Sequence, residues 1–350
     1  MMIKTNDLIA MTLGLLMAFS GCQTEKETPD KPEGSIPVGF SGDMPETRAA
    51  TEYGSVADLT AIGVFAYFTN GMFSESGSIP NFMYNQQVER QSVDGSWIYA
   101  PVKYWPGNTT DKISFFAYAP YVGETENSNL SFQDKGTASG FPVLGYTVPP
   151  VEADQMDFLA ATPVMNRNDG NVSFKLHHTL TKVNVWVKNN DNTEGKSVTS
   201  FSITGIKSGT LIYYAPTADT DNGWKWAYPS SDVKETFTAD ITNFPVPNTI
   251  LEGKKLLATF FLLPFGEGSQ FSITYQYTAK DANDNTITQT INKENQPLPS
   301  TDSWSPGASV GYTIGIARKT VSVMQEDGSV SWEEDTGSET VKGTEGETGS

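Results

Sequence analysis

Few side chains in this 350-residue sequence could do chemistry, and the most informative of them is its single cysteine, Cys22. A lone cysteine cannot form an intrachain disulfide or supply the thiolates of a structural zinc site. The two histidines, His177 and His178, are adjacent, so in a strand their rings point to opposite sides and cannot bind one metal ion. We therefore expect no catalytic residue, no metal site, no cofactor and no enzymatic activity.

His178 has a structural interpretation that suits its position. In strand alternation it shares one face with three apolar residues, Val172, Phe174 and Leu176. A histidine on an apolar face is usually buried and hydrogen-bonded, and we expect that role here. Trp224 and Trp226 also share a strand face and could stack on a sugar if exposed, but packing in the core is the favoured interpretation.

The position of Cys22 predicts a lipid anchor. Residues 8–19 are nearly apolar and end at Ser20-Gly21-Cys22, which is too short to span a bilayer but suits the core of a signal peptide. A bacterial lipoprotein signal peptidase would cut before Cys22 and leave it lipidated, for instance with palmitate. The sequence predicts a lipoprotein signal peptide over 1–21 and a polar, proline-containing tether over 22–35. A plain secretory signal is the alternative.

The charge balance excludes one class of partner. The formal net charge is −18 and the isoelectric point is near 4.5, so the protein repels phosphate backbones and we expect no nucleic-acid partner. Part of this charge lies in residues 333–350, which contain six acidic residues and one lysine and no aromatic residue. Such a segment buries too little apolar surface to order itself, and it predicts an acidic disordered tail.

The elements that position these residues are predicted to be strands. Apolar residues alternate in many short runs, turn clusters of Asn, Asp, Gly and Pro separate the runs, and no long helical stripe is present. The sequence therefore predicts an all-β protein with two tandem β-sandwich domains over 36–168 and 169–332. The boundary is placed at the polar cluster 166–171, because a fresh pair of long strands follows it.

A short strand is expected at the start of the first domain. Ile36, Val38 and Phe40 alternate, so their side chains share one face of this strand and would be buried like pegs in a groove. Pro37 has no amide proton, which places the strand at the edge of a sheet. Burial of three such side chains contributes roughly 5–9 kcal/mol, which is comparable to the stability of a whole domain.

The sequence resembles the fimbrillin (type V pilin, Mfa-like) family of the Bacteroidota. The segments that carry the resemblance are the signal ending at Cys22, 36–40 followed by ETRA at 46–49, YWP at 104–106 leading to ISFFAYAP at 113–120, MDFLAA at 156–161, 172–187, and WSPG at 304–307 running into GYTI at 311–314. The resemblance implies transthyretin-like sandwiches and a fimbrial subunit or accessory fimbrial lipoprotein. Its location would be the outer membrane and cell surface, and its partners other fimbrial subunits.

The resemblance also implies a processing step. In the family a trypsin-like cysteine protease cuts the lipidated precursor after an arginine, which removes the first strand, and a strand from another subunit fills the vacant groove. The cut would fall here between Arg48 and Ala49 and would release Ile36, Val38 and Phe40; an ordinary solvated loop arginine is the alternative. The donor could be the alternating C-terminal pattern of Val321, Val323, Val330 and Trp332, or these residues could pair within their own domain.

A rival function keeps the first strand in place. In that interpretation the protein is a surface lipoprotein, held in the outer membrane by its lipid, that binds glycan or protein ligands and never polymerises. Either function is compatible with a ligand on a host or bacterial surface. Cell adhesion is the role that we expect under the fimbrial interpretation.

Overall fold

The computed structural model describes residues 35–44, 55–91, 95–123, 129–228, 234–326 and 330–331. Within these ranges the chain is all-β, as predicted, and contains only four short 3-10 helices: η1 (Val56–Asp58), η2 (Glu152–Asp154), η3 (Ile250–Glu252) and η4 (Thr301–Ser303). No helix in this part of the chain is long and apolar enough to cross a membrane. The described residues from Ile36 onward belong to one compact unit.

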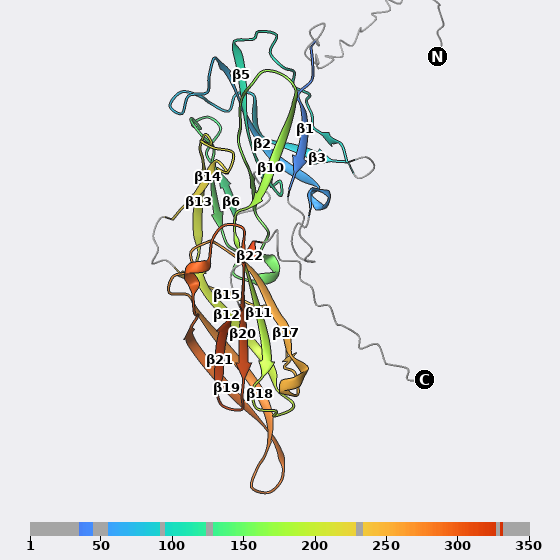
Figure 1. Ribbon diagram of the computed structural model, residues 1–350, viewed down its shortest axis with the longest axis vertical. Helices are drawn as coiled ribbons and strands as arrows, with labels where there is room; N and C mark the ends of the chain where they lie inside the picture. Colours follow the sequence, from blue (N-terminus) through green and yellow to red (C-terminus); the bar gives the residue numbers. More distant parts are fainter. Residues whose placement is uncertain are drawn as a thin grey trace, which may run out of the picture. The chain divides into compact units, whose positions relative to one another are not determined.

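The first sheet has eight strands and contains the candidate site (Figure 1). In spatial order its strands are β1 (Gly39–Asp43), β10 (Asn171–His178), β8 (Leu159–Ala161), β5 (Asp111–Ala119), β2 (Ala61–Asn70), β3 (Met83–Arg90) and β4 (Trp97–Ile98), with β9 (Val164–Arg167) also paired to β5. Only the pairing of β1 with β10 is parallel in this sheet. Strands β2 and β5 are buried on both faces, which explains their nearly continuous apolar sequences.

A second, four-stranded sheet combines distant parts of the sequence. Its order is β14 (Trp224–Ala227), β13 (Ser208–Tyr213), β7 (Val143–Thr147) and β6 (Leu130–Phe132). The central pair, β13 and β7, is antiparallel. Strands from either side of residue 168 therefore share one sheet.

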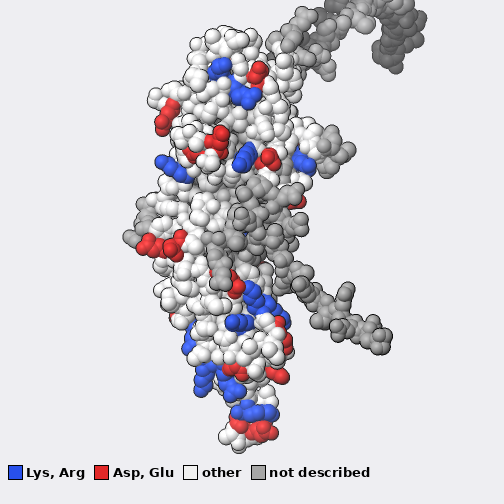
Figure 2. Space-filling view, viewed as in Figure 1, with Lys and Arg blue, Asp and Glu red and all other residues white. Residues whose placement is uncertain are grey.

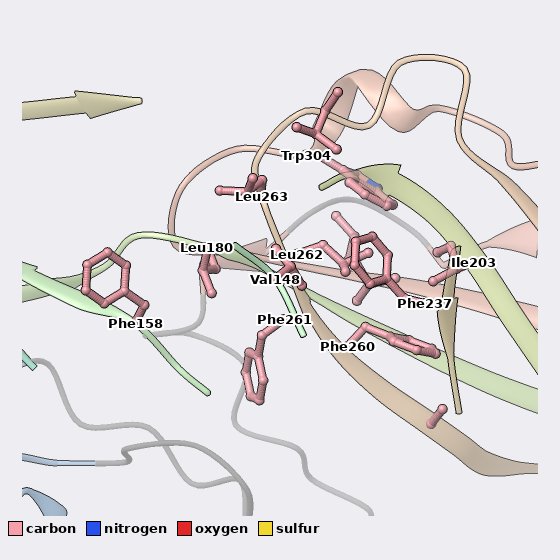
Figure 3. Close-up of a cluster of buried hydrophobic side chains, with 14 of the residues drawn as sticks. Val148, Phe158, Leu180, Ile203, Phe237, Phe260, Phe261, Leu262, Leu263 and Trp304 are labelled. Atoms are coloured by element: carbon pink, nitrogen blue, oxygen red, sulfur yellow. The ribbon is translucent and has the colours of Figure 1, made fainter. Parts of the chain in front are cut away.

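Two five-stranded sheets face each other across a common core. One contains β17 (Lys254–Leu262), β11 (Thr181–Asn189), β20 (Ala308–Ile316), β21 (Val321–Gln325) and β22 (Val330–Ser331); the other contains β15 (Lys234–Thr238), β12 (Ser197–Ile206), β18 (Gln270–Lys280), β19 (Thr286–Pro297) and β16 (Phe244–Pro245). Both send apolar side chains into one cluster, which is the arrangement of a β-sandwich. In Figure 3, Leu180 and Val148 lie between Phe158 and the side chains around Leu262.

The change of sheet does not fall at the expected boundary between residues 168 and 169. Strand β10, predicted to open the second domain, pairs with β1 and β8 in the first sheet, and β11 is the strand that enters the C-terminal sandwich. The polar cluster 166–171 contains the end of β9, the turn 168–170 and the first residue of β10, and turn residues alone do not distinguish a turn from a domain boundary. The chain passes from the first sheet to the C-terminal sandwich at residues 179–180, and β13, which is paired with β14, later returns to pair with β7.

Buried apolar side chains form two separate clusters. The larger one fills the C-terminal sandwich and continues through Leu180 and Phe158 to one face of the first sheet, where it includes Phe116 and Tyr118. The smaller one lies on the opposite face of that sheet and includes Phe115 and Phe174. The first strand contributes only to the smaller cluster.

Charges of both signs are interspersed on the surface. On the face drawn in Figure 2, Lys and Arg side chains alternate with Asp and Glu, and uncharged surface separates them. The acidic residues of 333–350 are outside the described part of the chain. The visible face therefore carries mixed charge in place of one continuous acidic field.

Candidate functional site

The first strand lies at the edge of the first sheet, as Pro37 predicted. Strand β1 runs parallel to β10, with Gly39 opposite Asn171 and Asp43 opposite Lys175. It is the terminal strand in the order of the sheet. Because β10 is far away in the sequence, no hairpin turn ties β1 to its partner, and removal of β1 would break no short connection.

Val38, Phe40 and Met44 are the side chains that this segment buries. They are 2%, 6% and 5% exposed, and all three belong to the smaller apolar cluster. Ile36 corrects our expectation, since its side chain is 62% exposed and contributes no peg. Sequence reasoning missed Met44 because we stopped the alternation at Phe40, although the same two-residue spacing continues through Gly42.

Phe40 occupies an aromatic box. Its ring centroid lies 5.2 Å from that of Tyr99, 5.9 Å from that of Phe115 and 5.8 Å from that of Phe174. The first two contacts are edge-to-face and the third is stacked, which are the favourable geometries for aromatic pairs. The three partners come from separate segments, so no local sequence pattern could predict the box.

Pro37 pairs with a second segment without needing an amide proton. It bridges antiparallel to Tyr104, and the hydrogen bonds flank this pair: Val38 N–H donates to the carbonyl of Lys103 (2.9 Å) and Trp105 N–H donates to the carbonyl of Ile36 (3.0 Å). In such a pair the residue between the two bonds turns its own N–H away from the partner. Proline is therefore accommodated at this position.

Side chains around the groove also bind the backbone and surface of the strand. The hydroxyl of Tyr99 donates to the carbonyl of Val38 (2.9 Å), and burial raises the pKa of this hydroxyl. The side-chain amide of Asn171 donates to the hydroxyl of Ser41 (2.8 Å). A Cβ atom on Gly39 would lie 2.7 Å from Asn171 Oδ1, so a larger residue at 39 would displace that side chain.

The processing and lipid sites lie outside the described residues. Cys22, Arg48 and Ala49 fall there, together with the signal peptide and most of the tether. Met44 is the last described residue before this gap, four positions before Arg48. Cleavage after Arg48 and lipidation of Cys22 therefore stay predictions.

The C-terminal pattern that could donate a strand pairs within its own sheet. Strand β21 carries Val321 and Val323 and pairs antiparallel with β20, and Val330 in β22 lies opposite Ser309 of β20. Both Val321 and Val323 pack partly buried against the larger cluster. Of the two alternatives for these residues, the structure shows intramolecular pairing; Trp332 is outside the described part.

His178 is buried and hydrogen-bonded, as predicted. Its Nδ1 lies 2.9 Å from the carboxylate of Asp157, and both side chains are almost fully buried. His177 lies on the opposite face of β10, with Nε2 3.0 Å from the hydroxyl of Thr162. Burial, aided by the positive charge of Lys175, lowers the pKa of His177 to about 4. The described residues contain no group of three or more side chains placed to hold a metal ion.

The depressed pKa of His177 predicts a pH-dependent contribution to stability. His177 is protonated below about pH 6.5 in the unfolded chain but only below about pH 4 in the folded protein. The free energy of unfolding should therefore fall as the pH is lowered from about 6.5 to about 4. In His177→Gln, whose amide can still bond Thr162, that part of the loss should vanish. Urea denaturation at several pH values would test this; parallel wild-type and variant curves would contradict it.

The tryptophans at 224 and 226 belong to the core, as favoured. Trp224 is buried in the larger cluster, and Trp226 packs against the same cluster. The indole N–H of Trp226 donates to the carbonyl of Thr179 (2.7 Å). The pair therefore supports the junction between sheets and provides no exposed stacking platform.

The described part of the chain is all-β, and its N-terminal strand β1 lies at the edge of the eight-stranded sheet. The model of the fimbrillin-like family matches residues 47–331, and the chain belongs to this family. Members of the family are structural, non-enzymatic proteins of fimbriae, which confirms the resemblance and the absence of an enzymatic function. The match begins after the first strand and one residue before Arg48.

Individual relatives agree with this assignment. The chain is 25% identical to the fimbrium subunit Fim1C of Phocaeicola vulgatus over 372 aligned positions, which cover 92% of this chain and 96% of the relative. A crystal structure of a fimbrial protein from Bacteroides vulgatus superimposes with a TM-score of 0.63 at 19% identity, covering 85% of this chain and 99% of that one. The second comparison shows that the fold is shared.

Proposed function

We propose that the protein is a fimbrial subunit or accessory fimbrial protein that assembles by strand exchange and serves adhesion at the cell surface. The observation that carries this proposal is the burial of Phe40 in the last strand of a sheet, and of Val38 and Met44 immediately before and after that strand. A strand of another subunit with the same alternation would fill the groove in its place, by the addition of a strand to a sheet edge. Membership of the fimbrillin-like family supports this role.

The groove would be costly to leave empty. Removing the three buried side chains would expose apolar partners on β10 and β5, among them Phe174 and Phe115. At 1.5–3 kcal/mol for each side chain, the loss is roughly 5–9 kcal/mol. This energy would favour capture of a new strand over a vacant edge.

The groove would be emptied in a precursor that is anchored to the membrane. In our proposal Cys22 carries the lipid that holds the protein in the outer membrane, and 23–35 is the tether. A cut between Arg48 and Ala49 would detach lipid, tether and first strand together, because all three precede the cut. The subunit would then depend on a neighbour for its missing strand.

Cleavage by an Arg-specific protease tests the proposal. We expect treated wild-type protein to lose residues up to Arg48 and to form a concentration-dependent ladder of oligomers that resist SDS, because the emptied groove binds a neighbouring strand. In the matched variant Arg48→Gln, the N-terminal piece should stay attached and the protein monomeric. N-terminal sequencing and gel electrophoresis provide the measurements.

Two outcomes would contradict this scheme. Complete cleavage after Arg48 that leaves only monomers would show that the groove does not capture a strand. Equal oligomerisation of Arg48→Gln would show that cleavage is unnecessary. The first outcome would favour the rival function, a surface protein that binds ligands without polymerising.

A further inference from the structure

A cleft of about 720 Å³ opens between four loops, away from the groove of the first strand. The loops follow β2, precede β7, join β8 to β9 and follow β13. The volume lies within the range of roughly 300–1,000 Å³ that is typical of small-molecule sites. Three aromatic side chains line the cleft, Phe73, Phe141 and Tyr214.

The two phenylalanines form a fixed wall. Their ring centroids are 4.8 Å apart, and each ring also lies 5.8 Å from the ring of Phe116. Phe116 is fully buried in the larger cluster, so the wall is backed by the core. These rings offer apolar surface that needs little rearrangement to accept a ligand.

Asn166 fixes the backbone beside this wall. Its side-chain oxygen accepts a hydrogen bond from Phe73 N–H (2.6 Å), and its own N–H donates to the hydroxyl of Ser114 (3.0 Å). Asn166 has a φ of 55°, a left-handed conformation that is uncommon for a residue other than glycine. Asn166 lies within the short strand β9, and backbone in such sparsely populated conformations clusters at functional sites.

Tyr214 is held at its hydroxyl and on one face. The hydroxyl donates to the carboxylate of Asp221 (2.6 Å), which also accepts the N–H groups of Thr217 and Gly223 (3.0 Å each). Lys225 Nζ lies 6.0 Å from the centroid of the ring, over its face. The ring is therefore held in position where it lines the cleft.

The charges of the lining limit the ligand. The exposed acidic residue Glu75 is among the lining residues, whereas Lys225, which lies against Tyr214, is not, so the lining carries a negative charge that disfavours anionic ligands. A neutral sugar suits the aromatic faces and the carboxylate, because it combines a flat C–H face with hydroxyl donors. We propose that this cleft binds a neutral hexose unit of a glycan, stacked on Tyr214 and hydrogen-bonded to Glu75. This activity is separate from assembly of the fimbria.

Calorimetric titration of the uncleaved, full-length protein tests the site. The probes are maltohexaose, mannohexaose and cellohexaose, with a heparin hexasaccharide as the anionic comparison. We expect at least one neutral oligosaccharide to bind and the anionic one to be excluded. Tyr214→Ala should weaken binding by about tenfold or more, and Tyr214→Phe, which keeps the ring, should lose less.

The controls separate stacking from a folding defect. Phe68→Ala removes an aromatic ring outside the cleft and should leave affinity unchanged, while circular dichroism checks that each variant is folded. No binding by all three neutral probes at millimolar concentration would overturn the proposal, as would binding that Tyr214→Ala leaves intact. Binding of a basic, proline-containing peptide but of none of the sugars would also overturn it and assign the cleft to a peptide. Because the first strand stays in place, none of these results depends on strand exchange.

Discussion

Replacing Phe40 with alanine should lower the free energy of unfolding by about 3–5 kcal/mol. The ring is 6% exposed and is enclosed by Tyr99, Phe115 and Phe174, with centroid distances between 5.2 and 5.9 Å. These partners belong to separate segments that other contacts hold in place, so they can collapse only partly into the cavity. Urea denaturation followed by tryptophan fluorescence measures the change.

Ile36→Ala is the matched control on the same segment. Ile36 is 62% exposed, so its truncation should change the free energy of unfolding by no more than about 0.5 kcal/mol. Equal losses in the two variants would show that the segment is not held by the side chains that the structure buries. A shift of the strand by one residue would turn Phe40 away from the core, so a small loss in Phe40→Ala would contradict the register.

Phe40→Ala also tests whether the stability of the first strand controls its release after cleavage. If Phe40 holds the first strand in its groove, cleaved Phe40→Ala should release that strand faster than cleaved wild-type protein. Ile36→Ala should release it at the wild-type rate. Mass spectrometry of the released piece over time gives these rates, and unchanged release from Phe40→Ala would assign retention of the strand to other contacts.

The sequence predicted the face of the first strand but not its limits. Alternation identifies residues that share a face, so Val38 and Phe40 were placed correctly. It does not show where the chain enters the sheet, and the exposed Ile36 and the buried Met44 differ from the expectation for this reason. The sequence also could not predict that β1 pairs in parallel with β10, because this pairing joins residues that are far apart in the chain.

A similar limit explains the domain boundary. The polar residues between β9 and β10 were identified correctly as a turn, but whether a turn ends a domain depends on contacts made by the strands on either side. The cleft residues Phe73, Phe141 and Tyr214 gave no signal for the same reason. Three loops that are distant in sequence bring them together, and no local spacing encodes that.

Asp191→Asn should destabilise the C-terminal sandwich by about 3–5 kcal/mol. Asp191 pairs with Lys196, whose side chain is 0% exposed and whose Nζ also donates to Asn189 Oδ1 (2.8 Å). The Asp191 carboxylate also accepts Thr193 N–H (3.0 Å) and Arg318 N–H (2.5 Å). An asparagine would keep part of these hydrogen bonds but leave the buried ammonium without a counter-charge.

Because the pKa of Asp191 is lowered, its contribution to the free energy of unfolding should depend on pH. Burial favours the neutral acid, but hydrogen bonds from Lys196 and from Thr193 and Arg318 outweigh it and lower the pKa to about 2. The group is only partly buried, so its titration should add a modest term that is present above pH 4 and lost as the pH falls toward 2. Asp191→Asn should lack this decline.

Two further variants separate a buried charge from an ordinary ion pair. Glu235→Gln breaks the exposed pair of Lys207 and Glu235 (2.9 Å) and should cost no more than about 1 kcal/mol. Adding Lys196→Met to Asp191→Asn should restore part of the lost stability, because it removes the unpaired charge while keeping the length of the side chain. If the double variant is less stable than Asp191→Asn alone, Lys196 stabilises the fold through its hydrogen bonds, and the unpaired charge is not the cause of the loss.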